Sequence, residues 1–135
     1  MRSLLVAILC LVASIAWAAP DWVEIGADTQ ARYYVDVVSI EVAGETVRIH
    51  KKGIYTQPLT ENLGGNPRVF KETLGVVELD CGRRIHRVTQ IDMLGPDGDV
   101  VWSSGPMPRR DWEGVLPKSH GEATLDFVCG KIGRS

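Results

Sequence analysis

The stretch Val76-Val77-Glu78-Leu79-Asp80-Cys81 decides the fold of this chain. Apolar and acidic residues alternate along it, which is typical of a β-strand with one buried face. Cys81 lies on the apolar face, and Glu78 and Asp80 lie on the other. We therefore expect the Cys81 thiol to point into the core, where it can be tied to another element.

That other element is predicted near the C-terminus. Ser119, followed three residues later by Glu122, matches a capping box, and Gly130 is a candidate for the end of a short helix. The alternation of Leu125 and Phe127 with the following cysteine also fits a strand, but the capping box favours the helix. A helix of about ten residues is marginal alone and must be held by packing.

Cys129 shares the apolar stripe of this helix with Leu125 and Val128. A disulfide between Cys81 and Cys129 would join the helix to the middle of a sheet. Closing a loop of about 49 residues contributes about 4 kcal/mol on the chain-entropy model. The alternative is a pair of reduced, buried thiols, which export to an oxidising compartment disfavours.

Export is indicated by residues 1–18, which have the layout of a cleaved signal peptide. Arg2 is followed by an apolar run and by the cleavage box Ala16-Trp17-Ala18. The run is shorter than the roughly 20 residues that span a bilayer, so an uncut anchor and a transmembrane segment after cleavage are not expected. Cys10 lies early in the signal and lacks the small neighbours of a lipidation site. Residues 19–135 are then predicted to form a single domain.

The fold class predicted for this domain is α+β: an antiparallel sheet of about six strands with one C-terminal helix on a face. The chain shows β composition in six segments, separated by turn residues: 21–26, 31–38, 46–55, 70–81, 83–94 and 99–103. Gly75 is predicted to be a bulge or a gap in a face. Prolines, glycines and asparagines between 56 and 68 predict a long loop.

The composition excludes several function classes. The formal net charge of the whole chain is −2, which does not favour nucleic-acid binding. The sequence lacks the GxSxG, P-loop and HExxH motifs, and a disulfide would remove the thiolate that a Cys81–His86 nucleophile needs. The histidines at 50, 86 and 120 lack the spacing of a zinc motif, and Glu78 with Asp80 is more simply a solvated strand face. We expect neither an enzyme nor a cofactor.

Basic residues carry the remaining surface signal, and we treat them as candidate partner-binding residues. Two groups are predicted, one on the 46–55 strand and one just after Cys81. They are Arg48, Lys51, Lys52, Arg83, Arg84 and Arg87. Brought together by strand pairing, they could engage sulfated glycans or an acidic protein segment. The alternative is that they pair with Glu72, Glu78 and Asp80 across the sheet.

An ordered set of short motifs resembles the surface-adhesin protein E family of Gram-negative bacteria. The set runs from Trp22 to Cys129: Trp22, Tyr34-Val35-Asp36, Ser39-Ile40, Glu78-Leu79-Asp80-Cys81, Arg84, Arg87, Gly98, Trp112, Pro117-Lys118-Ser119 and Cys129. The resemblance implies a six-stranded antiparallel sheet with a C-terminal helix and a disulfide.

The resemblance also implies a function. It implies an exported adhesin that binds host matrix or serum proteins such as vitronectin and laminin and that can form a homodimer. The alternative is a periplasmic structural or envelope-stress protein that has the same fold and no host ligand. Either protein would lie in the periplasm or at the outer surface of a Gram-negative cell.

Overall fold

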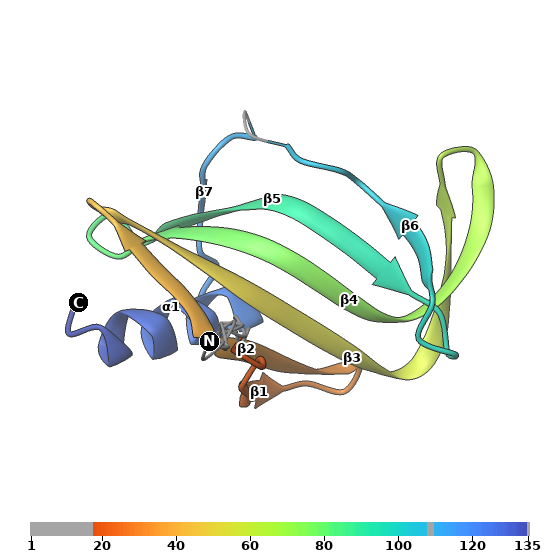
Figure 1. The fold of residues 1–135 in the computed structure, drawn as a ribbon, viewed down its shortest axis with the longest axis horizontal. Helices are drawn as coiled ribbons and strands as arrows, with labels where there is room; N and C mark the ends of the chain where they lie inside the picture. Colours follow the sequence, from red (N-terminus) through yellow and green to blue (C-terminus); the bar gives the residue numbers. More distant parts are fainter. Residues whose placement is uncertain (1–17, 108–109, 135) are drawn as a thin grey trace, which may run out of the picture.

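The computed structural model of the protein describes residues 18–107 and 110–134. The predicted signal peptide falls almost wholly on residues 1–17, outside the described residues. Figure 1 shows a curved sheet with a helix against its concave side, near one end of the sheet. The described part contains no helix that is both long and apolar enough to cross a membrane.

The sheet is antiparallel, and its strand order follows the chain. Six strands lie in the order β1-β2-β3-β4-β5-β6, and a two-residue seventh strand pairs with β5. The elements are β1 (Trp22–Ala27), β2 (Ala31–Ala43), β3 (Thr46–Leu63), β4 (Asn66–Asp80), β5 (Ile85–Leu94), β6 (Val100–Ser103), β7 (Glu113–Gly114) and α1 (His120–Lys131). The predicted α+β architecture is confirmed, with one short strand more than expected.

The core forms where α1 covers the concave face. Alternate residues of the central strands point to this face, and the helix contributes the apolar stripe seen in the sequence. The cluster consists of Val35, Val47, Ile49, Val77, Leu79, Cys81, Leu125, Val128 and Cys129, none more than 4% exposed. This burial of apolar surface fixes the face of every central strand, since a one-residue slip would turn the whole set outward.

The prediction of a long loop over residues 56–68 is wrong. Instead β3 and β4 continue as a hairpin, which turns at Gly64 and Gly65. Both glycines have positive φ, 62° and 85°, as a tight two-residue hairpin turn requires. Pro58 lies within a register shift, and Pro67 lies where β4 has no partner on its second edge. Neither proline therefore removes a hydrogen bond that the sheet needs.

The imperfect alternation of the fifth strand has a structural cause. Val76 pairs with Gln90 and Val77 pairs with Val88, so Thr89 is one extra residue in β5. The Thr89 hydroxyl donates to the Val76 carbonyl over 3.3 Å. Pairing is continuous on both sides of Gly75, which is therefore a gap in the face and not the bulge itself.

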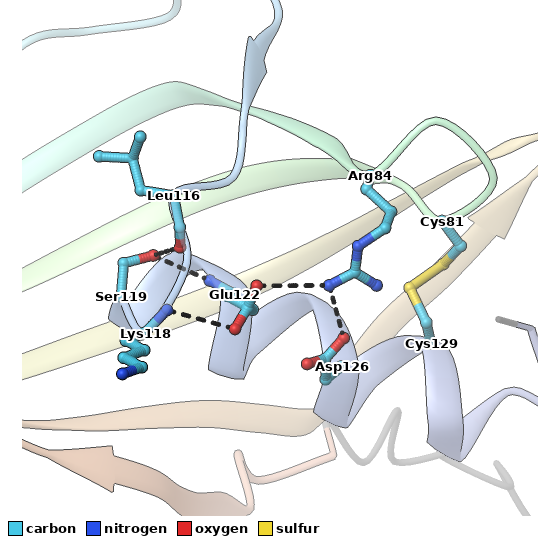
Figure 2. Close-up of polar contacts among 8 residues, drawn as sticks. All are labelled: Cys81, Arg84, Leu116, Lys118, Ser119, Glu122, Asp126 and Cys129. Atoms are coloured by element: carbon cyan, nitrogen blue, oxygen red, sulfur yellow. Dashed lines mark hydrogen bonds and ion pairs between the residues drawn. A yellow bond between two sulfur atoms is a disulfide. The ribbon is translucent and has the colours of Figure 1, made fainter.

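The start of α1 is the predicted capping box. Figure 2 shows the Ser119 hydroxyl accepting the Glu122 N–H at 3.2 Å. The Glu122 carboxylate reaches back to the N–H of Lys118, at 3.3 Å, and not to that of Ser119. The Ser119 hydroxyl also donates to the Leu116 carbonyl at 2.6 Å. The first of these bonds satisfies an N–H group that the first turn of a helix leaves without a partner, and the other two fix the segment before the helix.

The helix does not end at Gly130 as predicted. It continues to Lys131, and Gly133 takes the left-handed conformation, with φ of 75°. The N–H of Gly133 donates to the Gly130 carbonyl, and the N–H of Arg134 donates to the Cys129 carbonyl at 2.7 Å. This pair of bonds is a Schellman motif. Ile132 packs against the core, which explains why the later glycine is used.

The predicted disulfide between Cys81 and Cys129 is present. Their Cα atoms are 5.8 Å apart, and both residues are at most 3% exposed. Arg84 lies at the same junction, where its guanidinium is 3.0 Å from Asp126 and 3.7 Å from Glu122 of the helix (Figure 2). The covalent bond therefore holds α1 to the turn after β4, with these exposed ion pairs beside it.

Candidate functional site

The convex face of the sheet carries a row of alternating charges. Strand register places Glu41, Arg48, Glu78 and Arg87 side by side on β2, β3, β4 and β5. Arg87 pairs with Glu78 at 3.3 Å, and its guanidinium lies 4.3 Å from the centre of the Trp112 ring. Much of the positive charge in this row is therefore offset by its neighbours.

The basic residues at the β4–β5 turn are also paired. Arg83 lies 3.7 Å from Asp80, and Arg84 contacts the two helix carboxylates already described. Arg84 has a positive φ of 54°, and its side chain points toward the helix (Figure 2). Such exposed ion pairs contribute little stability, but they lower the charge available to a partner.

Lys52 lies on the convex face among aromatic rings. Its ammonium group is 4.4 Å from the centre of the Trp22 ring and 5.3 Å from that of Tyr34. Beside it runs a groove of about 410 Å³, lined by Trp22, Arg48, His50, Lys51, Leu74, Gly75, Val76, Gln90 and Asp92. The groove combines cations, aromatic surface and apolar surface, a composition found at protein-binding sites.

Lys51 is separated from the other candidates, because its side chain points to the concave face. Its Nζ lies 2.7 Å from Nδ1 of His120 and 5.5 Å from the centre of the Tyr33 ring. The His120 ring stacks on Tyr33 with centroids 4.1 Å apart. The Tyr33 hydroxyl in turn donates to Asp28 at 3.2 Å.

Burial changes the protonation of this group. It lowers the pKa of Lys51 to about 8. Burial and the nearby Lys51 ammonium lower the pKa of His120 to about 4. At neutral pH the His120 ring is therefore uncharged, and its Nδ1 accepts a hydrogen bond from the Lys51 ammonium.

The lysine faces a cavity of about 220 Å³ between the concave face and the start of α1. Its walls come from β2, β3, β4, β5 and the helix. They are formed by Tyr33, Lys51, Gly53, Tyr55, Glu61, Phe70, Thr73, Gly75, Val77, His86, Val88, Ile91, Met93, His120 and Thr124. Most of the surface of these walls is apolar, so the ammonium group lies at the border of an apolar space.

The structure therefore divides the six candidates among three places. Arg48, Lys52 and Arg87 lie on the convex face, Arg83 and Arg84 at the β4–β5 turn, and Lys51 in the concave cavity. The sequence analysis missed the cavity and the stacking of Tyr33 on His120. The sequence did contain one indication of this position. Lys51 lies two residues after Ile49 and four after Val47, so strand alternation places all three side chains on the same face. In the described part, no three histidine, cysteine or acidic residues are grouped to hold a metal ion.

Comparison with known proteins adds a family and a fold. Residues 22–130 match the family model for surface-adhesin protein E. The structure of Haemophilus influenzae protein E is similar at a TM-score of 0.59 and 14% identity, covering 87% of this chain and 95% of that chain. A crystal structure of protein E from non-typeable Haemophilus influenzae is similar at a TM-score of 0.57 and 14% identity. The match covers 86% of this chain and 84% of that chain. Among curated proteins, none matches this sequence.

The two comparisons carry different weight. At 14% identity the structural likeness shows a shared fold. The family match extends from the first residue of β1 to the last turn of α1, and so includes both cysteines of the disulfide. The chain belongs to the surface-adhesin protein E family.

Proposed function

We propose that this protein is an exported binding module that attaches to a host matrix or serum protein, with vitronectin and laminin as the first candidates. It acts by binding, without catalysis and without a cofactor. The observation that carries the proposal is the family match over residues 22–130. A family of surface adhesins implies export to the cell surface.

Within the molecule, the convex face is the contact surface that we propose. Arg48 and Lys52 lie beside the groove there, and neither takes part in an ion pair among the described residues. Trp22 and Tyr34 supply aromatic surface next to them. Aromatic and cationic groups that are already held in place lose little entropy when a partner binds. Arg83 and Arg84 form a second candidate contact.

The experiment is direct binding to immobilised vitronectin and laminin at about 0.15 M salt. We expect the wild-type protein to bind and the double variant R48E/K52E to bind at least tenfold more weakly. The variant R83E/R84E tests the turn in the same way. Arg87 is left unchanged, because its substitution would also break the contacts with Glu78 and Trp112.

The matched control is K118E/K131E, which removes the same positive charge from exposed positions on and beside α1. Its binding should equal that of the wild type, and thermal unfolding should show that every variant is folded. Equal losses in all three double variants would indicate attraction by net charge and would contradict a site on the convex face. Absence of wild-type binding to either protein would remove the proposed ligands.

Cell-surface exposure is tested separately by adding protease to whole cells. An adhesin is cut in intact cells, whereas a periplasmic protein is protected until the outer membrane is opened. The homodimer implied by the resemblance is tested by sedimentation of the purified protein across a concentration series. A single monomeric species at every concentration would exclude it under those conditions.

A further inference from the structure

The cavity on the concave face has features that attachment through the convex face does not explain. The cavity lies on the opposite side of the sheet from Lys52 and the groove. A host protein bound to the convex face would therefore not fill the cavity. Apolar walls with one positive group at the border are typical of pockets for small ligands.

The positive group has capacity for a further partner. Lys51 Nζ contacts Nδ1 of His120 at 2.7 Å and the His120 carbonyl at 3.5 Å, and an ammonium group has three donors. None of the ion pairs among the described residues includes Lys51. Lys51 is partly buried beside apolar walls, where a cation without a counter-ion is less well solvated than in water, and a bound anion would offset that loss.

The two ends of the cavity differ in charge. Strand register places Lys51, Gly75 and Ile91 in one row near the helix, Gly53, Thr73 and Met93 in the next row, and Phe70 beyond them. Glu61 lines the cavity near Tyr55 and Phe70. A single negative group on a ligand would therefore be attracted to the Lys51 end, with its apolar body directed along the sheet.

The size of the cavity limits the ligand. A cavity of about 150 Å³ holds benzene, so about 220 Å³ holds a somewhat larger apolar body. We propose that this cavity binds a small monocarboxylate with an apolar body of about six to eight carbon atoms, its carboxylate on Lys51 Nζ. A medium-chain fatty acid and an alkyl benzoate share this chemistry.

The test is calorimetric titration of the protein with octanoate at pH 6.5, with 1-octanol as the uncharged analogue. We expect saturable octanoate binding that Lys51→Met weakens at least tenfold, while octanol binding changes less than twofold. Lys52→Met is the matched control, because it removes the neighbouring charge on the opposite face. It should leave octanoate binding unchanged.

A second variant fills the space instead of removing the charge. A Cβ atom at Gly75 would have no contact closer than 3.6 Å, and its φ is not in the left-handed region. Gly75→Val should therefore fold, since valine favours strands, and its side chain would enter the cavity. We expect it to abolish binding of both octanoate and octanol.

The pH dependence gives a third readout. The groups facing Lys51 are His120 and His86, which burial keeps neutral at pH 7, and Tyr33 and Tyr55, whose pKa values burial raises. The Asp28 carboxylate keeps its charge over this range, because hydrogen bonds from the N–H groups of Gln30 and Ala31 lower its pKa. Octanoate affinity should thus fall as the pH rises from 7 to 9.5, while octanol affinity stays constant.

Three outcomes would overturn the proposal. The first is no saturable octanoate binding to the wild-type protein at millimolar concentration. The second is equal octanoate binding by wild type and folded Lys51→Met. The third is undiminished binding by folded Gly75→Val, which would place the ligand elsewhere. If Lys51→Met does not fold, the pH dependence of octanoate binding and the Gly75→Val variant still test whether octanoate binds in the cavity.

Discussion

The two ends of the concave face differ in how they are filled. At the packed end, defined by Val35, Val47, Ile49, Val77 and Leu79, the helix supplies Leu125, Val128 and Cys129. At the hollow end, defined by Gly53, Tyr55, Phe70, Thr73 and Met93, the strands continue over the cavity. Strands β3 and β4 run through both ends, so the difference lies in what covers them.

Element length explains this difference. A helix of 12 residues is about 18 Å long, whereas the 18 residues of β3 would extend over about 60 Å when straight. One short helix therefore covers only part of the sheet. The glycines at 53 and 75 leave further space, because they add no side chain to the cavity walls. Stability is concentrated at one end of the molecule, and room for a ligand at the other.

The largest effect should come from the bond that closes the packed end. The double variant C81A/C129A should lose about 4 kcal/mol of unfolding free energy, because the bridge joins residues 48 positions apart. Urea denaturation measures the loss. A loss below about 1 kcal/mol would mean that packing alone holds α1 in place.

Core truncations should separate the two ends more directly. Leu125→Ala removes a fully buried side chain at the packed end and should cost about 3 kcal/mol. Met93→Ala lies beside existing empty space, where fewer contacts are lost, and should cost about 1 kcal/mol. Equal losses in urea denaturation would contradict the contrast between the ends.

The unfolding free energy, measured over a pH series, should reveal the titration of Lys51, which lies between the two ends. Lys51 has a folded pKa of about 8 against an ordinary value of 10.5, so between these values the unfolded chain binds more protons. Unfolding free energy should therefore rise with pH from 8 to 10, by about 2 kcal/mol. Above pH 10, Tyr33 opposes the rise, because its folded pKa of about 12 exceeds the ordinary 10.0.

The control for this effect is the neighbouring lysine. Lys51→Met should remove the rise between pH 8 and 10, and Lys52→Met should retain it. Urea denaturation at each pH measures both. A rise that persists in Lys51→Met would assign the titration to another group.

The smallest effect should come from the helix cap. Ser119→Ala leaves the Glu122 N–H without its acceptor and should cost about 1 kcal/mol. Ser119→Asp keeps an acceptor and should restore most of the loss. No change in the melting temperature of Ser119→Ala would mean that the disulfide and Arg84 fix the first turn by themselves.

Much of the packed end could be predicted from sequence, because its signals are local. Alternation placed Leu79 and Cys81 on the core face, and the capping box located Ser119. The hairpin was missed because proline and glycine were interpreted as loop residues. The pair Gly64-Gly65 between strand-like segments was the signal for a two-residue turn, since both positions require positive φ.

The cavity could not be predicted in the same way. Its walls come from four strands and the helix, and its volume depends on sheet curvature and on the position of α1. Alternation could assign Lys51 to the concave face, but not its distance from His120, which lies 69 residues later. The roles of the six basic residues depend likewise on partners distant in sequence, such as Asp126 for Arg84.

The chain-order topology of the sheet has a consequence for assembly. Each of the first six strands pairs with its sequence neighbour, so the meander can form hairpin by hairpin from the N-terminus. The segment that carries Cys129 is synthesised after all the strands and completes the core. Oxidation of the thiols therefore records the final docking step, and trapping them during refolding would time the arrival of the helix.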